Sequence, residues 1–94
     1  MIDKVILKEG PFKINELKPG EIQKAPTGGW YLACPRCGIP CGLAHDVIIN
    51  DQKEVTISPS IGHPKTVNGF PNGCGAHYLV KNSKIEWCSD MERG

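Results

Sequence analysis

Two pairs of metal-binding side chains stand out in this sequence. Cys34 and Cys37 are separated by two residues in the segment CPRCG, and Cys74 and His77 by two residues in the segment CGAH. A turn that contains C-x-x-C can point both sulfurs at one ion, and Gly38 permits the left-handed backbone that follows. Three thiolates and one imidazole complete a tetrahedral zinc shell. The spacing therefore predicts a structural Zn²⁺ ion whose ligands are Cys34, Cys37, Cys74 and His77.

The remaining cysteines leave the second ligand open. Cys41 lies four residues after Cys37 and could replace it, although the two-residue spacing from Cys34 favours Cys37. Cys88 follows Trp87 at the end of a strand-like segment, where a small buried thiol is the simpler interpretation. The five cysteines cannot all pair in disulfides, and clustered cysteines in reducing surroundings favour metal.

Acid–base chemistry has weaker support than metal binding. A hydrolytic zinc site needs an open coordination position and a nearby acid–base group, whereas three cysteines and one histidine fill the shell. The chain contains neither a His-x-Glu nor a His-Glu-x-x-His pattern. His45 and His63 are candidates for an acid–base role, but a lone histidine is more often a surface or hydrogen-bonded residue. The sequence therefore predicts a binding module rather than an enzyme.

The composition limits the range of partners. The chain has 94 residues, of which 39% are hydrophobic and 22% charged, and its formal net charge is +1. This balance is typical of a globular domain and gives no electrostatic case for nucleic acid or for an acidic membrane surface. The sequence has no apolar run near the ~18 residues that span a bilayer, and its N-terminus lacks a signal-peptide pattern. We therefore expect a cytoplasmic protein that acts on a protein partner.

Short strands must position these side chains. Eleven glycines and eight prolines imply many turns, and no segment keeps a helical period. Compact or alternating apolar runs predict strands at residues 30–33, 43–50, 54–58, 76–81 and 84–88.

The segments between these strands are less regular. Residues 12–17 fit either a short strand or a turn of helix, Pro59 ends the third strand, and residues 60–73 are expected to be mostly loop. The predicted fold class is a small, mostly β single domain over residues 1–94, with antiparallel strands and a zinc-ribbon-like knuckle. Residues 1–25 are expected to add an edge strand and a loop to a zinc core at residues 30–88.

Three segments of the chain resemble a known family. They are CPRCG at residues 34–38, ISPSIG at residues 57–62 and GCGAHYLVKNSKIEW at residues 73–87. Together they resemble small bacterial and phage-encoded proteins of unassigned function. The pattern of that family is a CP-x-CG-like cluster, a Pro-Ser-[Ile/Val]-Gly segment, and C-x-x-H followed by an aromatic residue, a strand, a turn and a tryptophan. Family members usually have a more compressed cysteine cluster, so the choice between Cys37 and Cys41 stays open.

The resemblance implies metal binding in a bacterial or viral cytoplasmic setting. Some members of that family are encoded beside ubiquitin-like conjugation components, an association that names no substrate. The leading hypothesis is a structural-zinc module, of phage or bacterial origin, that acts through protein–protein contacts. One alternative is a nucleic-acid-binding zinc ribbon. A second alternative is a zinc hydrolase linked to ubiquitin-like conjugation, with His45 or His63 as its acid–base group.

Overall fold

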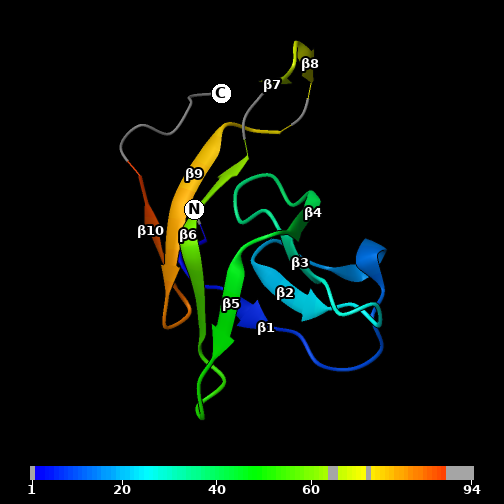
Figure 1. Ribbon diagram of the computed structural model, residues 1–94, viewed down its shortest axis with the longest axis vertical. Coiled ribbons are helices and arrows are strands. Elements are labelled where there is room, and N and C mark those ends of the chain that lie inside the picture. Colours follow the sequence, from blue (N-terminus) through cyan, green and yellow to red (C-terminus); the bar gives the residue numbers. More distant parts are fainter. Residues whose placement is uncertain (1, 64–65, 72, 89–94) are drawn as a thin grey trace.

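Two four-stranded β-sheets form the body of the protein, and a two-stranded hairpin projects from one end (Figure 1). This structure is a computed structural model that describes residues 2–63, 66–71 and 73–88. In chain order, its elements are β1 (Ile6–Leu7), the 3₁₀ helix η1 (Ile14–Glu16), β2 (Glu21–Lys24), β3 (Trp30–Ala33), β4 (Pro40–Leu43), β5 (Asp46–Ile49), β6 (Val55–His63), β7 (Thr66–Val67), β8 (Phe70–Pro71), β9 (Ala76–Lys81) and β10 (Lys84–Trp87).

The first sheet has the strand order β10-β9-β6-β5 and is antiparallel throughout. Its two tight turns use polar residues. The Asn50 side chain accepts hydrogen bonds from the N–H groups of Gln52 and Glu54 in the β5–β6 turn. Asn82 and Ser83 form the β9–β10 turn with φ values of 49° and 66°. These local bonds satisfy the backbone where the strands reverse, and they fix the register of both hairpins.

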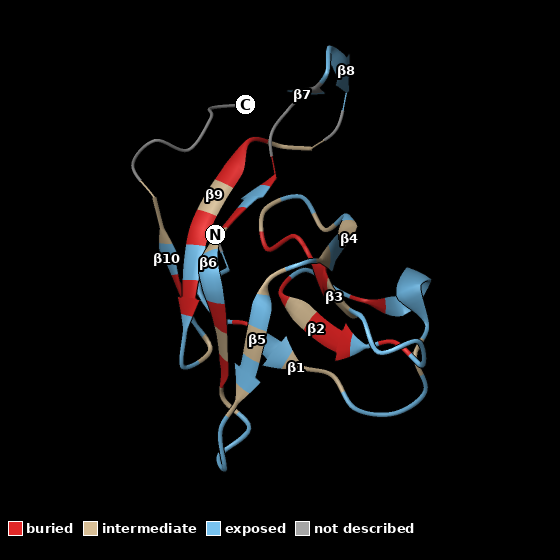
Figure 2. Ribbon diagram, viewed as in Figure 1, coloured by how far each residue is buried: buried red, intermediate tan, exposed pale blue. Residues whose placement is uncertain are grey.

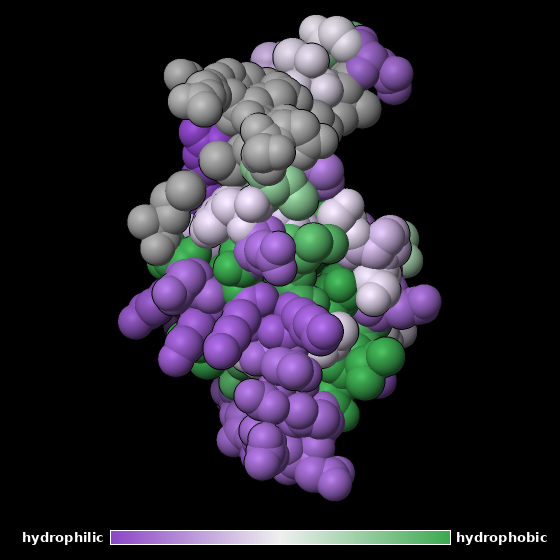
Figure 3. All heavy atoms as spheres, turned by 90° about the vertical axis from the view of Figure 1, so that its left-hand side faces the viewer, coloured by the Kyte–Doolittle hydropathy of each residue, from purple (hydrophilic) through white to green (hydrophobic). Residues whose placement is uncertain are grey.

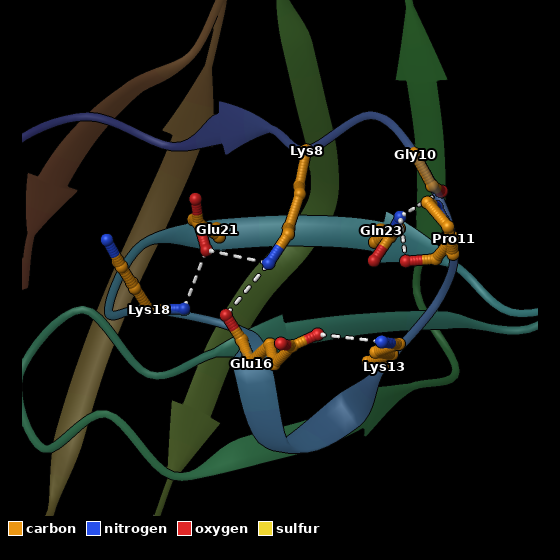
Figure 4. A network of polar contacts seen from close by, with 8 residues as sticks. All are labelled: Lys8, Gly10, Pro11, Lys13, Glu16, Lys18, Glu21 and Gln23. Carbon is orange, nitrogen blue, oxygen red and sulfur yellow. Dashed lines mark hydrogen bonds and ion pairs between the residues drawn. The ribbon is translucent and has the colours of Figure 1, made fainter.

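The second sheet has the strand order β1-β2-β3-β4 and contains one parallel pair, β1 with β2. A polar network on its surface ties down the N-terminal part of the chain (Figure 4). The Lys8 ammonium donates to the Glu16 carbonyl at 2.8 Å and lies 3.8 Å from the Glu21 carboxylate. The Gln23 side chain donates to the Gly10 carbonyl at 2.8 Å. Residues before β2 are thereby held against the second sheet.

The hydrophobic core lies between the two sheets. Figure 2 shows buried residues along β9, β6, β2 and β3, and these side chains form a single cluster. Its members include Ile22 and Leu32 from the second sheet and Tyr78 and Val80 from the first. Because both sheets contribute to one cluster, the chain folds as one domain. Ser83 adds polar ties, since its carbonyl accepts from the Val5 N–H at 2.8 Å and its hydroxyl accepts from the Val55 N–H at 2.8 Å.

The surface differs between the two ends of the molecule. On the face of the molecule that carries β10, hydrophilic residues cover most of the lower end, and hydrophobic residues are exposed near the middle (Figure 3). The β7–β8 hairpin extends beyond the sheets, and its Phe70 side chain is 73% exposed. No helix in the described part of the chain is long and apolar enough to cross a membrane.

The predicted fold class is confirmed, because the protein is a small, mostly β domain built from antiparallel strands. The strands β3 and β9 have the predicted bounds. The prediction that Pro59 ends a strand is wrong, because β6 continues to His63. Residues 60–73 hold the end of β6 and the β7–β8 hairpin rather than mostly loop. Pro59 is tolerated because the pairing of β6 is irregular between Ile57 and Ile61, so no regular ladder bond is lost there.

Candidate metal centre and serine–histidine pair

Four side chains meet where the two sheets come together. Their ligand atoms all lie within 4.8 Å of one another, and they belong to Cys34, Cys37, His63 and Cys74. The turn between β3 and β4 carries the first two, His63 ends β6, and Cys74 precedes β9. Figure 1 shows that turn beside the upper end of β6. The backbone closes the turn by a bond from the Gly38 N–H to the Cys34 carbonyl at 2.8 Å.

The distances in this cluster fit a tetrahedral metal ion. The sulfurs of Cys34 and Cys74 are 3.5 Å apart, and Nδ1 of His63 lies 3.6 Å from Cys37 Sγ and 3.8 Å from Cys74 Sγ. Tetrahedral zinc with ordinary bond lengths requires about 3.8 Å between two sulfurs and about 3.6 Å between sulfur and nitrogen. Three soft sulfurs and one imidazole at these separations form a metal-binding group of a type that suits zinc.

The protonation tendencies of these groups suit a bound cation. Burial raises the pKa of the Cys34 thiol to about 12, so this group becomes a thiolate only when a positive charge compensates it. Burial opposes ionisation of Cys74 too, but the Ala76 N–H and the nearby Arg36 charge help to outweigh it, and its pKa is lowered. Burial lowers the pKa of His63 and favours the neutral imidazole that metals bind.

Contacts on the other side of the ring hold His63 in place. Its Nδ1 faces the cluster, while its Nε2 lies 3.4 Å from the sulfur of Cys41. The His63 carbonyl accepts a hydrogen bond from the Gly75 N–H at 2.7 Å. Gly73 lies so close that a Cβ there would be 2.3 Å from Cδ2 of the ring. Contacts around the ring, of the kind that Cys41 and Gly73 make here, orient metal-binding histidines. Cys41 is one of these contacts and is not a member of the group of four.

The histidine that the sequence predicted as the fourth ligand lies outside this cluster. Nε2 of His77 is 2.9 Å from the hydroxyl oxygen of Ser60, and His77 is not part of the cluster. His77 is on β9 and Ser60 is on β6, and the two strands are neighbours in the first sheet. A serine hydroxyl at this distance from an imidazole is the arrangement in which histidine can remove the hydroxyl proton.

Ser60 lies in a bulge of β6, two residues before Gly62, which pairs with His77. Ile57 pairs with Val80 and Ile61 pairs with Tyr78, so residues 58–60 of β6 face only Leu79 of β9. The extra residues bend the strand and re-aim its side chains.

His45 holds the bulge from the other side. Its Nε2 lies 3.1 Å from the carbonyl oxygen of Ser60 and must donate, because a carbonyl only accepts.

Strand geometry separates the metal cluster from the serine–histidine pair. Side chains three positions apart on a strand point to opposite faces. On β6 this separates Ser60 from His63, which is buried. Cys74 lies before β9, and Gly75, with a φ of 83°, turns the chain between Cys74 and that strand. His63 and Cys74 therefore join the cluster, whereas Ser60 and His77 meet as the serine–histidine pair.

The structure brings together the three cysteines that the sequence predicted as ligands, but the histidine beside them is not the predicted one. Cys34, Cys37 and Cys74 lie in one cluster with His63, a residue that the sequence offered as an acid–base group. The C-x-x-H spacing suggested His77, and the strand predicted at residues 76–81 is present, but on that strand the ring contacts Ser60 rather than the sulfurs. Ser60 was not identified, because no nucleophile motif surrounds it. Cys88 follows β10 and is half-buried, and its N–H donates to the His77 carbonyl at 2.9 Å.

Comparison with known proteins identifies the family of this chain. The comparison with curated proteins and the comparison with solved structures gave no match. A family model described as "Bacterial ubiquitination-like system serine protease (BubE)" matches residues 8–88. The matched region contains the cluster, Ser60 and His77, and it spans most of the 94 residues. The chain therefore belongs to the bacterial ubiquitination-like system serine protease (BubE) family.

Proposed function

We propose that this protein is a serine protease in which Ser60 is the nucleophile and His77 is the general base. The observation that carries the proposal is the 2.9 Å separation between Ser60 Oγ and His77 Nε2. The family name supplies the reaction class. This proposal differs from the binding module that the sequence suggested. The binding module stays a prediction.

The reaction follows from the positions of these two groups. His77 Nε2 accepts the hydroxyl proton while Ser60 Oγ bonds to the carbonyl carbon of the scissile amide. The same nitrogen returns the proton to the leaving amine as the C–N bond breaks, which leaves an acyl ester on Ser60. A water molecule then attacks that ester and gives one proton to His77. His77 passes this proton to Ser60 Oγ as the ester bond breaks, which releases the acid and restores the free serine and the neutral imidazole.

The metal-binding cluster supports this pair structurally in our proposal. Zn²⁺ would be held by Cys34, Cys37, His63 and Cys74, with no position left for substrate. His63 ends β6 three residues after Ser60, and Cys74 lies three residues before His77, just ahead of β9. Fixing these two residues therefore fixes the register of β6 and β9 that keeps Ser60 beside His77.

The substrate class comes from the family name. A serine protease of a ubiquitination-like system acts on the proteins of that system, so we propose a ubiquitin-like protein or its conjugate as substrate. The protein partner expected from the sequence is then this substrate. The formal net charge of +1 gives no electrostatic case for nucleic acid as the partner instead.

The test is covalent labelling by a small fluorophosphonate, which phosphonylates an activated serine with loss of fluoride. We expect the wild-type protein to be labelled at Ser60, as mass spectrometry of the digested protein will show. Ser60→Ala should abolish labelling, and His77→Ala should slow it by about 10²–10⁴-fold, the usual contribution of a general base.

Metal content separates this proposal from the ligand set expected from the sequence. Purified His77→Ala should retain one zinc ion, whereas His63→Ala should lose it, as measured by elemental analysis. Labelling that is equal in wild type and His77→Ala would refute the proposed catalytic pair. Zinc loss in His77→Ala with retention in His63→Ala would instead restore His77 as the ligand.

A further inference from the structure

We propose that Gly62 is a specificity-determining residue, over which the main chain of the substrate passes as it enters the site. This inference rests on the proposed function, because it concerns how a peptide reaches Ser60. Gly62 lies two residues after Ser60 on β6 and pairs directly with His77 on β9.

Gly62 faces the same side of the sheet as the serine–histidine pair. Its neighbours Ile61 and His63 are both buried, whereas Gly62 is exposed. Because side chains alternate along a strand, a side chain at position 62 would point outward beside His77. Any group bound for Ser60 from this end of β6 must cross that position.

The fold itself does not require glycine at this position. Gly62 is not among the glycines with positive φ, and a Cβ built on it would meet no atom within 4 Å. Gly73 differs, because a Cβ there would collide with the His63 ring. Glycine weakens the interior of a strand, and a glycine that local geometry does not demand often marks a close approach of another backbone.

The edge of β6 beside Gly62 offers main-chain contacts. β5 pairs with β6 only from Val55 to Ser58, and no described strand pairs with the rest of that edge. The His63 carbonyl is turned toward β9, where it accepts from Gly75, so the polar groups of Gly62 face the opposite, unpaired edge. An extended peptide can add to such an edge by main-chain hydrogen bonds.

A small hollow flanks this edge. Its volume is about 60 Å³, and its walls include Leu43, His45, Gly62 and Tyr78. The His45 Nδ1 atom is buried and has no hydrogen-bond partner among the described residues. Leu43 and Tyr78 give this hollow an apolar wall next to the strand edge where the main chain of the substrate would lie.

The experiment compares two reagents on wild type, Gly62→Ala and Gly62→Val. One is the small fluorophosphonate, and the other is a tripeptidyl diphenyl phosphonate, which needs the extended site. We expect wild type to react faster with the peptidyl reagent. Gly62→Val should react with the peptidyl reagent at least about tenfold more slowly than wild type, because small displacements of a reacting group are costly. The rate of Gly62→Ala should lie between those of wild type and Gly62→Val. Labelling by the small reagent should stay within about twofold.

The controls separate substrate access from folding and from the proposed function. Gly29, in the β2–β3 turn, has similar open space around its Cα, and Gly29→Ala should leave both rates unchanged. The melting temperature of Gly62→Val should not fall, since valine favours strands. This inference would be overturned if wild type and Gly62→Val reacted equally fast with the peptidyl reagent, or if wild type did not prefer that reagent. Labelling of Ser60 in either case would still support the proposed serine protease. No labelling by either reagent would remove both.

Discussion

At the scale of single residues, the structure places two histidines differently from what the sequence suggested. His77 follows Cys74 at a spacing that fits a zinc ligand, and His63 lies beside a proline in an expected loop. The structure instead places His63 against the sulfurs and His77 against Ser60. Spacing predicted the three cysteines because a C-x-x-C turn and a second soft donor are local signals. It could not predict which histidine lies with them, because that depends on the extension of β6 to His63 and on its pairing with β9.

Gly73→Ala tests how the His63 ring is held. The added Cβ would lie 2.3 Å from Cδ2 and 2.6 Å from Nε2, so the ring must move away from its place in the cluster. We expect zinc to be released to a chelator at least about tenfold faster, as when the supporting contacts of a metal ligand are removed. A coloured chelator measures this rate, and Gly29→Ala is the control. An unchanged release rate would show that the ring moves without affecting the site.

At the scale of elements, β6 is the strand that organises both sites. Its first half forms a regular ladder with β5, its middle bulges at residues 58–60, and its end reaches the metal-binding cluster. The alternation of residues 54–58 predicted the first half. Nothing in the sequence predicted the continuation through Pro59, because the pairing that accepts a proline there comes from β9, about twenty residues further along the chain.

His45→Ala tests whether the bulge is held from the side of β5. Loss of the bond from Nε2 to the Ser60 carbonyl leaves the bulge less fixed, and Oγ should then spend less time opposite His77. We expect labelling of Ser60 to slow by about tenfold, which corresponds to the loss of one hydrogen bond. His45→Gln retains a donor and should recover part of the rate. Zinc content should not change, and zinc loss in His45→Ala would point to a general collapse instead.

At the scale of the whole molecule, the cluster joins the two sheets. Cys34 and Cys37 follow a strand of the second sheet, whereas His63 ends a strand of the first sheet and Cys74 precedes another. The mostly β class was predictable from composition and alternation. The strands β2 and β4 were missed because β2 has a single apolar residue, Ile22, and β4 contains the turn-forming residues Pro40 and Gly42. Their pairing with β3 is set by the shared core, which no local pattern reveals.

Leu32→Ala tests the shared core. Leu32 is 1% exposed and lies in the cluster between the sheets. The truncation should lower the free energy of unfolding by about 2–5 kcal/mol, the usual range for a buried leucine. Leu79→Ala is the matched control, because Leu79 is 41% exposed and the change should stay within about 0.5 kcal/mol. Denaturant unfolding of the zinc-loaded protein measures both, and equal losses would contradict a core located between the sheets.

The β7–β8 hairpin has both of its ends fixed by the same cluster. It follows His63 and precedes Cys74 in the chain, and among the described residues its two strands pair with each other alone. Its tip, at Asn68 and Gly69, can therefore accept an inserted reporter domain or a longer graft without altering the chain on either side. Related proteins would be free to vary this arm in length and to fit different docking partners while the chemistry beneath it stays constant.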